Sequence, residues 1–107
     1  MSTPSRIQQL LQLLGSEPQD VFLNYALGIE YSVQAQQHDF AEVQFKKVLE
    51  LDAEYLAVYY QLGKLYEAKQ QIQEALHYFK IGLEKAKQQK NNKAINEFGE
   101  AVFMLED

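Results

Sequence analysis

The chain has 107 residues, of which 47% are hydrophobic, so it can bury one compact core and is too apolar for a disordered segment. The absence of cysteine excludes disulfides, thiolate metal sites and a cysteine nucleophile. It agrees with a reducing compartment, and we expect a cytoplasmic protein. The net charge of −5 argues against sequence-independent nucleic-acid binding, which needs a basic face.

The N-terminal region does not have the pattern of a targeting segment. Residues 7–14 form an apolar run that glutamines interrupt, whereas a signal peptide needs an unbroken apolar stretch. No stretch approaches membrane-spanning length either. We therefore expect a protein that does not enter a membrane.

The chain predicts an all-α fold. Apolar residues recur at helical spacing almost throughout, no strand pattern competes, and the only prolines stand at positions 4 and 18. The predicted helices cover residues 4–14, 21–35, 39–51, 53–69, 73–89 and 92–106. Capping residues are expected at four helix starts, namely Thr3 ahead of Pro4, Asp20, Asp39 with Glu42 as a capping box, and Asp52.

Two parts of the sequence repeat. Residues 24–31 (NYALGIEY) match residues 59–66 (YYQLGKLY), and residues 41–45 (AEVQF) match residues 75–79 (ALHYF). The first match has a period of 35 residues and the second a period of 34. One extra residue is therefore expected in the turn at residues 36–39 of the first unit.

At these positions the chain resembles the tetratricopeptide repeat family, whose pattern is W-x2-L-G-x2-Y…A-x3-F…P over about 34 residues. The matching residues are Leu27, Gly28, Tyr31, Ala41 and Phe45 in the first unit and Leu62, Gly63, Tyr66, Ala75 and Phe79 in the second. Asn24 and Tyr59 replace the tryptophan, and Ala53 and Lys87 replace the closing proline. Without that proline, the last helix of the second unit is free to run long.

The ends resemble partial repeats. Leu10 and Pro18 have the spacing of the family's aromatic residue and closing proline, and Phe98-Gly99-x2-Val102 resembles its Leu-Gly-x2-Tyr block. The resemblance implies a single domain with the architecture of a short right-handed α-solenoid. Its parts are a half-repeat at residues 4–14, repeat units at 21–53 and 55–89, and a capping helix at 92–106.

The mid-helix glycines indicate close helix contacts. A glycine inside a helix is about 1 kcal/mol less favourable than alanine, so Gly28 and Gly63 need a reason to lack a side chain. Close approach of a partner helix supplies one, with Ala41 and Ala75 as small counterparts. The leucine and aromatic residues of the repeat pattern would fill the space around each contact.

The resemblance also implies a concave groove, lined by the first helix of each unit, for a peptide or partner helix. Its positions are Phe22, Tyr25, Ile29 and Ser32 in the first unit and Ala57, Tyr60, Lys64 and Glu67 in the second. Of the Lys, Asn and Arg residues with which some members clamp a C-terminal carboxylate, only Lys64 is present. We therefore expect an aromatic-lined groove in which Lys64 binds a ligand carboxylate or carbonyl. Alternatively, some of these aromatic side chains pack against the terminal helices.

Other candidate sites have simpler explanations. Glu74 and His77 have the Glu-x-x-His spacing of two metal ligands on one helix face. A metal site of this kind needs a second Glu-x-x-His motif, which the chain lacks. Turn and capping chemistry explains His38, Asp39 and Glu42, and no nucleophile stands in a catalytic pattern or phosphate loop. We expect no enzyme, metal or cofactor. A basic stretch, which could bind an anionic partner or simply form a solvated helix face, contains Lys80, Lys85, Lys87, Lys90 and Lys93.

Together these observations predict a protein-binding module or scaffold. The main alternative is a structural protein that self-associates as a homo-oligomer and has no groove ligand. Binding of nucleic acid or another anion through residues 80–93 is the weaker functional alternative.

Overall fold

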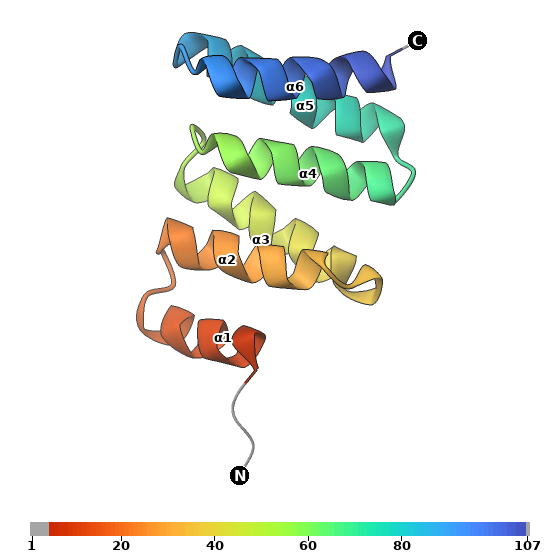
Figure 1. Cartoon of the computed structure of the whole chain (residues 1–107). Helices are drawn as coiled ribbons and strands as arrows, with labels where there is room; N and C mark the ends of the chain where they lie inside the picture. Colours follow the sequence, from red (N-terminus) through yellow and green to blue (C-terminus); the bar gives the residue numbers. More distant parts are fainter. Residues whose placement is uncertain (1–4, 107) are drawn as a thin grey trace. The chain divides into compact units, whose positions relative to one another are not determined.

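The computed structural model describes residues 5–106, so the expected helix start at Thr3 and Pro4 lies outside the described residues. The described chain is all-helical, with six α-helices, one short 3₁₀ turn and no strand (Figure 1). It forms two compact units, the first ending at Ala53 and the second beginning at Glu54. This division falls between the two predicted repeat units.

The first unit contains α1 (Arg6–Ser16), α2 (Val21–Ser32) and α3 (His38–Leu51). Ser5 caps α1 in a capping box with Gln8, and Asp20 caps α2 by accepting a hydrogen bond from the backbone N–H of Leu23 at 2.8 Å. The prediction for Asp20 is confirmed. The 3₁₀ turn Ala35–Gln37 occupies the α2–α3 connection. It overlaps the turn expected at residues 36–39 only in part, because α2 already ends at Ser32 and α3 begins at His38.

Two of the predicted caps are wrong. Asp39 lies inside the first turn of α3, whose N-cap is Gln37 without a side-chain bond, because the 3₁₀ turn leads directly into the helix. Asp52 ends α3 as its C-cap, and the next helix starts only at Leu56 after a turn at residues 53–55. Both aspartates had suitable neighbours in the sequence, but the 3₁₀ turn before Asp39 and the turn after Asp52 place the helix starts elsewhere.

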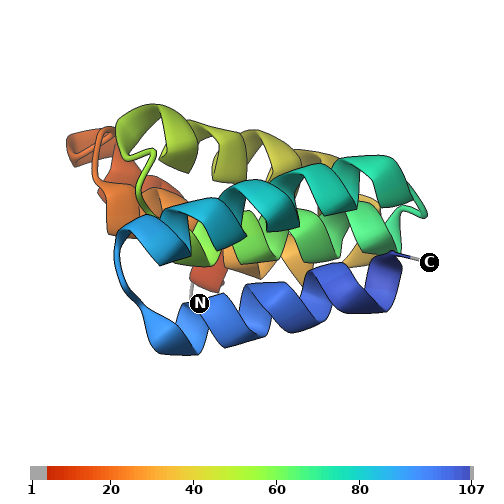
Figure 2. The same ribbon diagram turned by 90° about the horizontal axis from the view of Figure 1, so that it is seen from above.

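The second unit contains α4 (Leu56–Ala68), α5 (Ile72–Gln88) and α6 (Asn92–Leu105). Within this unit α4 and α6 run in the same direction and α5 runs opposite to both (Figure 1), and Figure 2 shows α5 and α6 joined by a tight turn at one end. Asn91 caps α6 by accepting from the backbone N–H of Ala94 at 3.0 Å. As expected, α5 runs long, with 17 residues against 14 in α3.

Each glycine predicted at a close helix contact lies under a phenylalanine ring. A Cβ added to Gly28 would stand 2.4 Å from Phe45, and a Cβ added to Gly63 would stand 2.3 Å from Phe79. Both distances are far below van der Waals contact, so any side chain at these positions would displace the ring. The close contact itself is therefore confirmed, but the nearest side chains are the two phenylalanines and not the expected Ala41 and Ala75.

A third contact of the same kind was not predicted. A Cβ added to Gly82 on α5 would stand 2.4 Å from the ring of Phe98 on α6. The helix α5 thus contributes to two such contacts: its Phe79 lies over Gly63 of α4, and its Gly82 lies under Phe98 of α6. The cores of the α2–α3, α4–α5 and α5–α6 pairs are built on one recurring contact.

The residues of the repeat pattern form the core as predicted. Their side chains are buried, with Ala41, Phe45, Leu62 and Ala75 fully so, except that Tyr31 is half-buried and rests on Phe40. Asn24, in the tryptophan place, is a buried polar residue. Its amide donates to the carbonyls of Pro18 and Asp20, and Gln44 donates to its side-chain oxygen. Asn24 therefore joins the α1–α2 turn to α3 by hydrogen bonds, which satisfies the polar group.

An ion pair joins the start of the second unit to the end of α5. The Lys85 Nζ lies 3.1 Å from a carboxylate oxygen of Glu54, and the Gln89 amide donates to the backbone carbonyl of Glu54 at 2.9 Å. The Lys85 and Gln89 hydrogen bonds hold the pKa of Glu54 below its ordinary 4.5. The Glu54 carboxylate in turn raises the pKa of Lys85 above 10.5.

We predict that Glu54→Gln lowers the melting temperature slightly at neutral pH and not in acid. Because the folded pKa of Glu54 is lowered, its stabilisation is present above pH 4.5 and is lost as pH falls through the folded value. Because the pKa of Lys85 is raised, stabilisation is present below pH 10.5 and is lost as pH rises through the folded value. Thermal melts of both proteins across pH check this, and an equal difference at every pH would contradict it.

Candidate functional site

The predicted groove residues lie in different units. Phe22, Tyr25, Ile29 and Ser32 lie on α2 of the first unit, and the four others lie on α4 of the second unit. Each set is therefore described in its own unit.

On α2, Phe22 is the most accessible of the predicted residues, with 64% of its surface exposed. It lines a hollow of about 290 Å³ together with Leu13 and Leu23, and Glu17 and Asp20 are also in its wall. The other three are less available. Tyr25 and Ile29 are half-buried, the Tyr25 ring lies 6.0 Å from the ring of Phe45, and Ser32 donates its hydroxyl to the carbonyl of Ile29.

On α4, Tyr60 is half-buried and its ring lies between two core rings. The centroid distances are 5.6 Å to Phe79 on α5 and 5.8 Å to Phe98 on α6. The alternative in which a groove aromatic packs against a terminal helix therefore holds for Tyr60. The Lys64 Nζ lies 6.0 Å from the Tyr60 ring centroid, within cation–π range.

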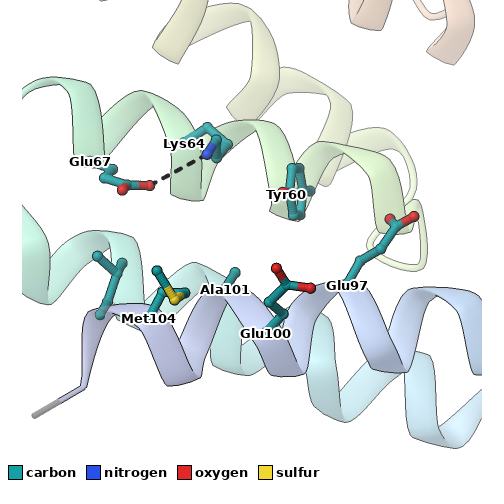
Figure 3. A pocket seen from close by; sticks show the side chains of 8 residues that line it. Tyr60, Lys64, Glu67, Glu97, Glu100, Ala101 and Met104 are labelled. Atoms are coloured by element: carbon teal, nitrogen blue, oxygen red, sulfur yellow. Dashed lines mark ion pairs between the residues drawn. The ribbon is translucent and has the colours of Figure 1, made fainter.

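Tyr60, Lys64 and Glu67 line one pocket between α4 and α6, with a volume of about 250 Å³ (Figure 3). The opposite wall comes from α6 and consists of Glu97, Glu100, Ala101, Met104 and Leu105. Met104 is 73% exposed and stands at the rim. The structure thus brings together three of the four α4 residues of the prediction and adds a second wall that the prediction lacked.

The electrostatics of this pocket differ from the expectation. The Lys64 Nζ lies 3.8 Å from a carboxylate oxygen of Glu67, so a neighbour on the same helix opposes part of its charge. Figure 3 shows the carboxylates of Glu97 and Glu100 reaching into the gap between the two helices. With three glutamates and one lysine in its lining, the pocket is acidic. It does not suit the acidic ligand that Lys64 alone suggested.

A second hollow of about 190 Å³ continues the space between α4 and α6 and shares Tyr60 and Glu97 with the first. It is lined by Leu56, the predicted Ala57, Ala94 and Phe98, with Asn91 and Lys93 also in its wall. The two hollows form one groove along α4 and α6, which we call the α4–α6 groove. The sequence did contain a signal for the α6 side of this groove. Ala57 and Lys64 lie five residues before and two residues after Leu62, and Lys93 and Glu100 lie at the same offsets from Phe98.

The basic stretch is partly engaged in ion pairs. Lys80 pairs with Glu106 at 2.8 Å, and Lys85 pairs with Glu54. Lys87, Lys90 and Lys93 are exposed. Intramolecular carboxylates therefore oppose part of the charge that would attract an anionic partner.

The candidate metal residues are placed separately. His77 is exposed and lies edge-on to the neighbouring Tyr78 ring, and the His38 Nε2 lies 3.1 Å from the carbonyl oxygen of Ser32. In residues 5–106 no group of three or more His, Asp or Glu side chains could hold a metal ion. No helix of the described chain is long and apolar enough to span a bilayer.

In fold class the described chain is an all-α protein. No protein family and no curated protein matches its sequence. Among solved structures, it is similar to protein BPP2914 from Bordetella parapertussis, a structural genomics target whose solution structure covers 96% of this chain. The TM-score is 0.84, the sequence identity is 20%, and 89% of that chain is covered. At this identity the likeness shows the fold alone.

Proposed function

We propose that this chain is a protein-binding module of the tetratricopeptide type, a short α-solenoid that acts as a cytoplasmic scaffold. The repeated Leu-Gly-x2-Tyr blocks and the recurring glycine–phenylalanine contacts support the family resemblance. The observation that carries the function is the α4–α6 groove, which is open, lined on both sides and furnished with both apolar and charged side chains.

The chemistry of the groove favours a cationic partner. Tyr60, Ala101, Met104 and Leu105 offer apolar area for an anchoring side chain, and aromatic and Met residues suit such contacts. Glu97 and Glu100 stand where an arginine or lysine next to that anchor would meet them. We therefore propose a peptide or partner helix that carries a basic residue beside an apolar one.

Two alternatives are less well supported. A homo-oligomer without a groove ligand gives no reason for the apolar and charged side chains that line both sides of the α4–α6 groove. An anion or nucleic acid bound at residues 80–93 can use Lys80 and Lys85 only by displacing the Glu106 and Glu54 carboxylates from them. The overall charge of −5 opposes such binding as well.

The experiment is a pull-down from native cytoplasm followed by calorimetric titration of the captured partner against groove variants. Met104→Ala should weaken binding by about 1 kcal/mol or more, the usual level for an interface residue that matters. It should leave the melting temperature nearly unchanged, because Met104 is largely exposed. Tyr60→Ala should weaken binding as well, with an added loss of stability from its contacts with Phe79 and Phe98.

Charge variants separate specific binding from general attraction. Glu100→Lys should weaken a cationic partner severalfold and Lys64→Glu should strengthen it, both less so at high salt. The matched control is Glu84→Lys, which changes the net charge equally at an exposed position of α5 outside the groove lining. If Glu100→Lys and Met104→Ala bind like the unmodified protein, the groove is not the binding surface.

A further inference from the structure

Two glycines of the chain, Gly15 and Gly99, have no ring above them. Gly15 is the second-last residue of α1, whereas Gly99 lies in the middle of α6. Gly99 on α6 follows Phe98 as Gly28 follows Leu27 and Gly63 follows Leu62, yet a Cβ added to Gly99 would meet nothing within 4 Å. Gly28, Gly63 and Gly82 each accept a phenylalanine from a neighbouring helix. Gly99 is thus a position of the same kind that the described chain leaves uncovered.

The same face of α6 carries an exposed phenylalanine. Residues four apart lie on one face of a helix, so Phe103 stands one turn beyond Gly99. With 78% of its surface exposed, it is more accessible than any other large hydrophobic residue of the described chain. Helical spacing places Asn92, Asn96 and Glu106 on this face too, and all three are exposed. We call these five residues the open face of α6.

We infer that the open face of α6 binds the open face of a second copy of this chain, as an antiparallel helix pair about a two-fold axis. With Phe103 of one copy over Gly99 of the other, the symmetry makes the contact twice. The second copy therefore supplies the side chain that Gly28, Gly63 and Gly82 receive from within the chain.

The charges of the open face permit this pairing in a chain whose net charge of −5 otherwise repels its own copies. The centre of the face is uncharged. Its carboxylate, Glu106, is held by Lys80 at 2.8 Å, and the two-fold register sets it opposite the Asn96 amide of the other copy. Among the five residues of the open face, no like charges meet across the pair.

The expected dimer is weak. One pair of 14-residue helices buries less than the roughly 1,200 Å² of a standard interface, so association should depend on protein concentration. The pairing does not use the α4–α6 groove, because Glu97, Glu100 and Met104 lie on another side of α6. Groove binding and self-association can therefore be tested separately.

The test is sedimentation of the purified full chain from micromolar to near-millimolar concentration, with a thermal melt of each variant. The unmodified protein should pass from monomer to dimer. Phe103→Ala should weaken the dimer by about tenfold or more. Gly99→Ala should weaken it as much, because its methyl group strikes the incoming ring, while keeping or raising the melting temperature of the monomer, where the methyl group meets open space.

Met104→Ala is the matched control, since it removes a comparably exposed apolar side chain from the groove side of α6. It should leave the dimer unchanged. A protein that stays monomeric over the whole range overturns the inference, and any partner of this face is then a different protein. A dimer that Gly99→Ala leaves intact, or that Met104→Ala weakens equally, also overturns it.

Discussion

Gly63→Leu should unfold the second unit or loosen it severely. The Cβ alone would stand 2.3 Å from the Phe79 ring, so leucine must either expel the ring or separate α4 from α5. Overpacking typically costs about 1 to 3 kcal/mol, and losing a buried phenylalanine costs about 3 to 5 kcal/mol. A loss near 3 kcal/mol corresponds to a fall in melting temperature of roughly 12 °C or more for a unit of this size. Thermal and urea unfolding measure the change.

Gly15→Leu is the control for the effect of leucine itself. Gly15 lies in α1, is exposed, and has nothing within 4 Å of an added Cβ. Replacing a glycine inside a helix by a better helix former should then be neutral or stabilising by up to about 1 kcal/mol. A raised melting temperature in Gly63→Leu would refute the close contact and, with it, part of the repeat alignment.

Removing residues 93–107 should expose the apolar side of α5 and cause aggregation. In the intact chain, the buried side chains of Ala94, Phe98 and Val102 cover this side, with Ile95 and Leu105 half-buried beside them. Terminal helices of repeat arrays act as solubilising caps. Light scattering and circular dichroism of the truncated protein check this, and a soluble monomer of unchanged stability would show that α6 is an appendage.

Phe98→Ala tests the same contact without shortening the chain. It empties the space above Gly82 and removes a ring neighbour of Tyr60, so we expect a loss of about 3 to 5 kcal/mol. Phe103→Ala is the control, because it truncates the same residue type at an exposed position of the same helix. Its effect on the stability of the monomer should stay within about 0.5 kcal/mol.

The sequence predicted the helices well because apolar periodicity reports directly on which residues are buried. It also predicted the role of Gly28 and Gly63, since a mid-helix glycine is unfavourable without a packing reason. Gly82 was missed although the spacing to its phenylalanine is the same, with 16 or 17 residues in all three pairs. The family pattern marks a glycine only where it follows leucine in a Leu-Gly-x2-Tyr block, and Gly82 follows Ile81 outside such a block.

The backbone conformation of the α4–α5 and α5–α6 turns could not be predicted, because these turns do not use the expected residues. Gln70 and Lys90 both adopt left-handed conformations, with φ of 62° and 57°, at the ends of α4 and α5. The next residue donates back to the helix in each case, Gln71 to Tyr66 and Asn91 to Ala86. Glycine is the usual residue at this position of such a helix end, so two non-glycine residues gave no signal.

The α4 side of the candidate site was predicted and its charge was not. The repeat alignment placed Tyr60, Lys64 and Glu67 correctly on one surface, because neighbours on a helix follow from spacing. The acidic character of the pocket comes from Glu97 and Glu100, which are far away in sequence and reach the site through the packing of α6 on α5. A pattern read along one helix cannot report the charge of the wall opposite.

The two glycines of the last two helices differ in how freely they can change. On α5, Phe79 packs on Gly63 of α4 and Gly82 accepts Phe98 of α6. A substitution at either α5 residue therefore needs a compensating change in α4 or α6. At Gly99 no described neighbour has to adjust to an added methyl group. In related chains, these two α5 residues should therefore vary only together with the residues they contact on α4 and α6. The open face of α6, in contrast, can acquire new side chains, and with them new partners, with little loss of stability.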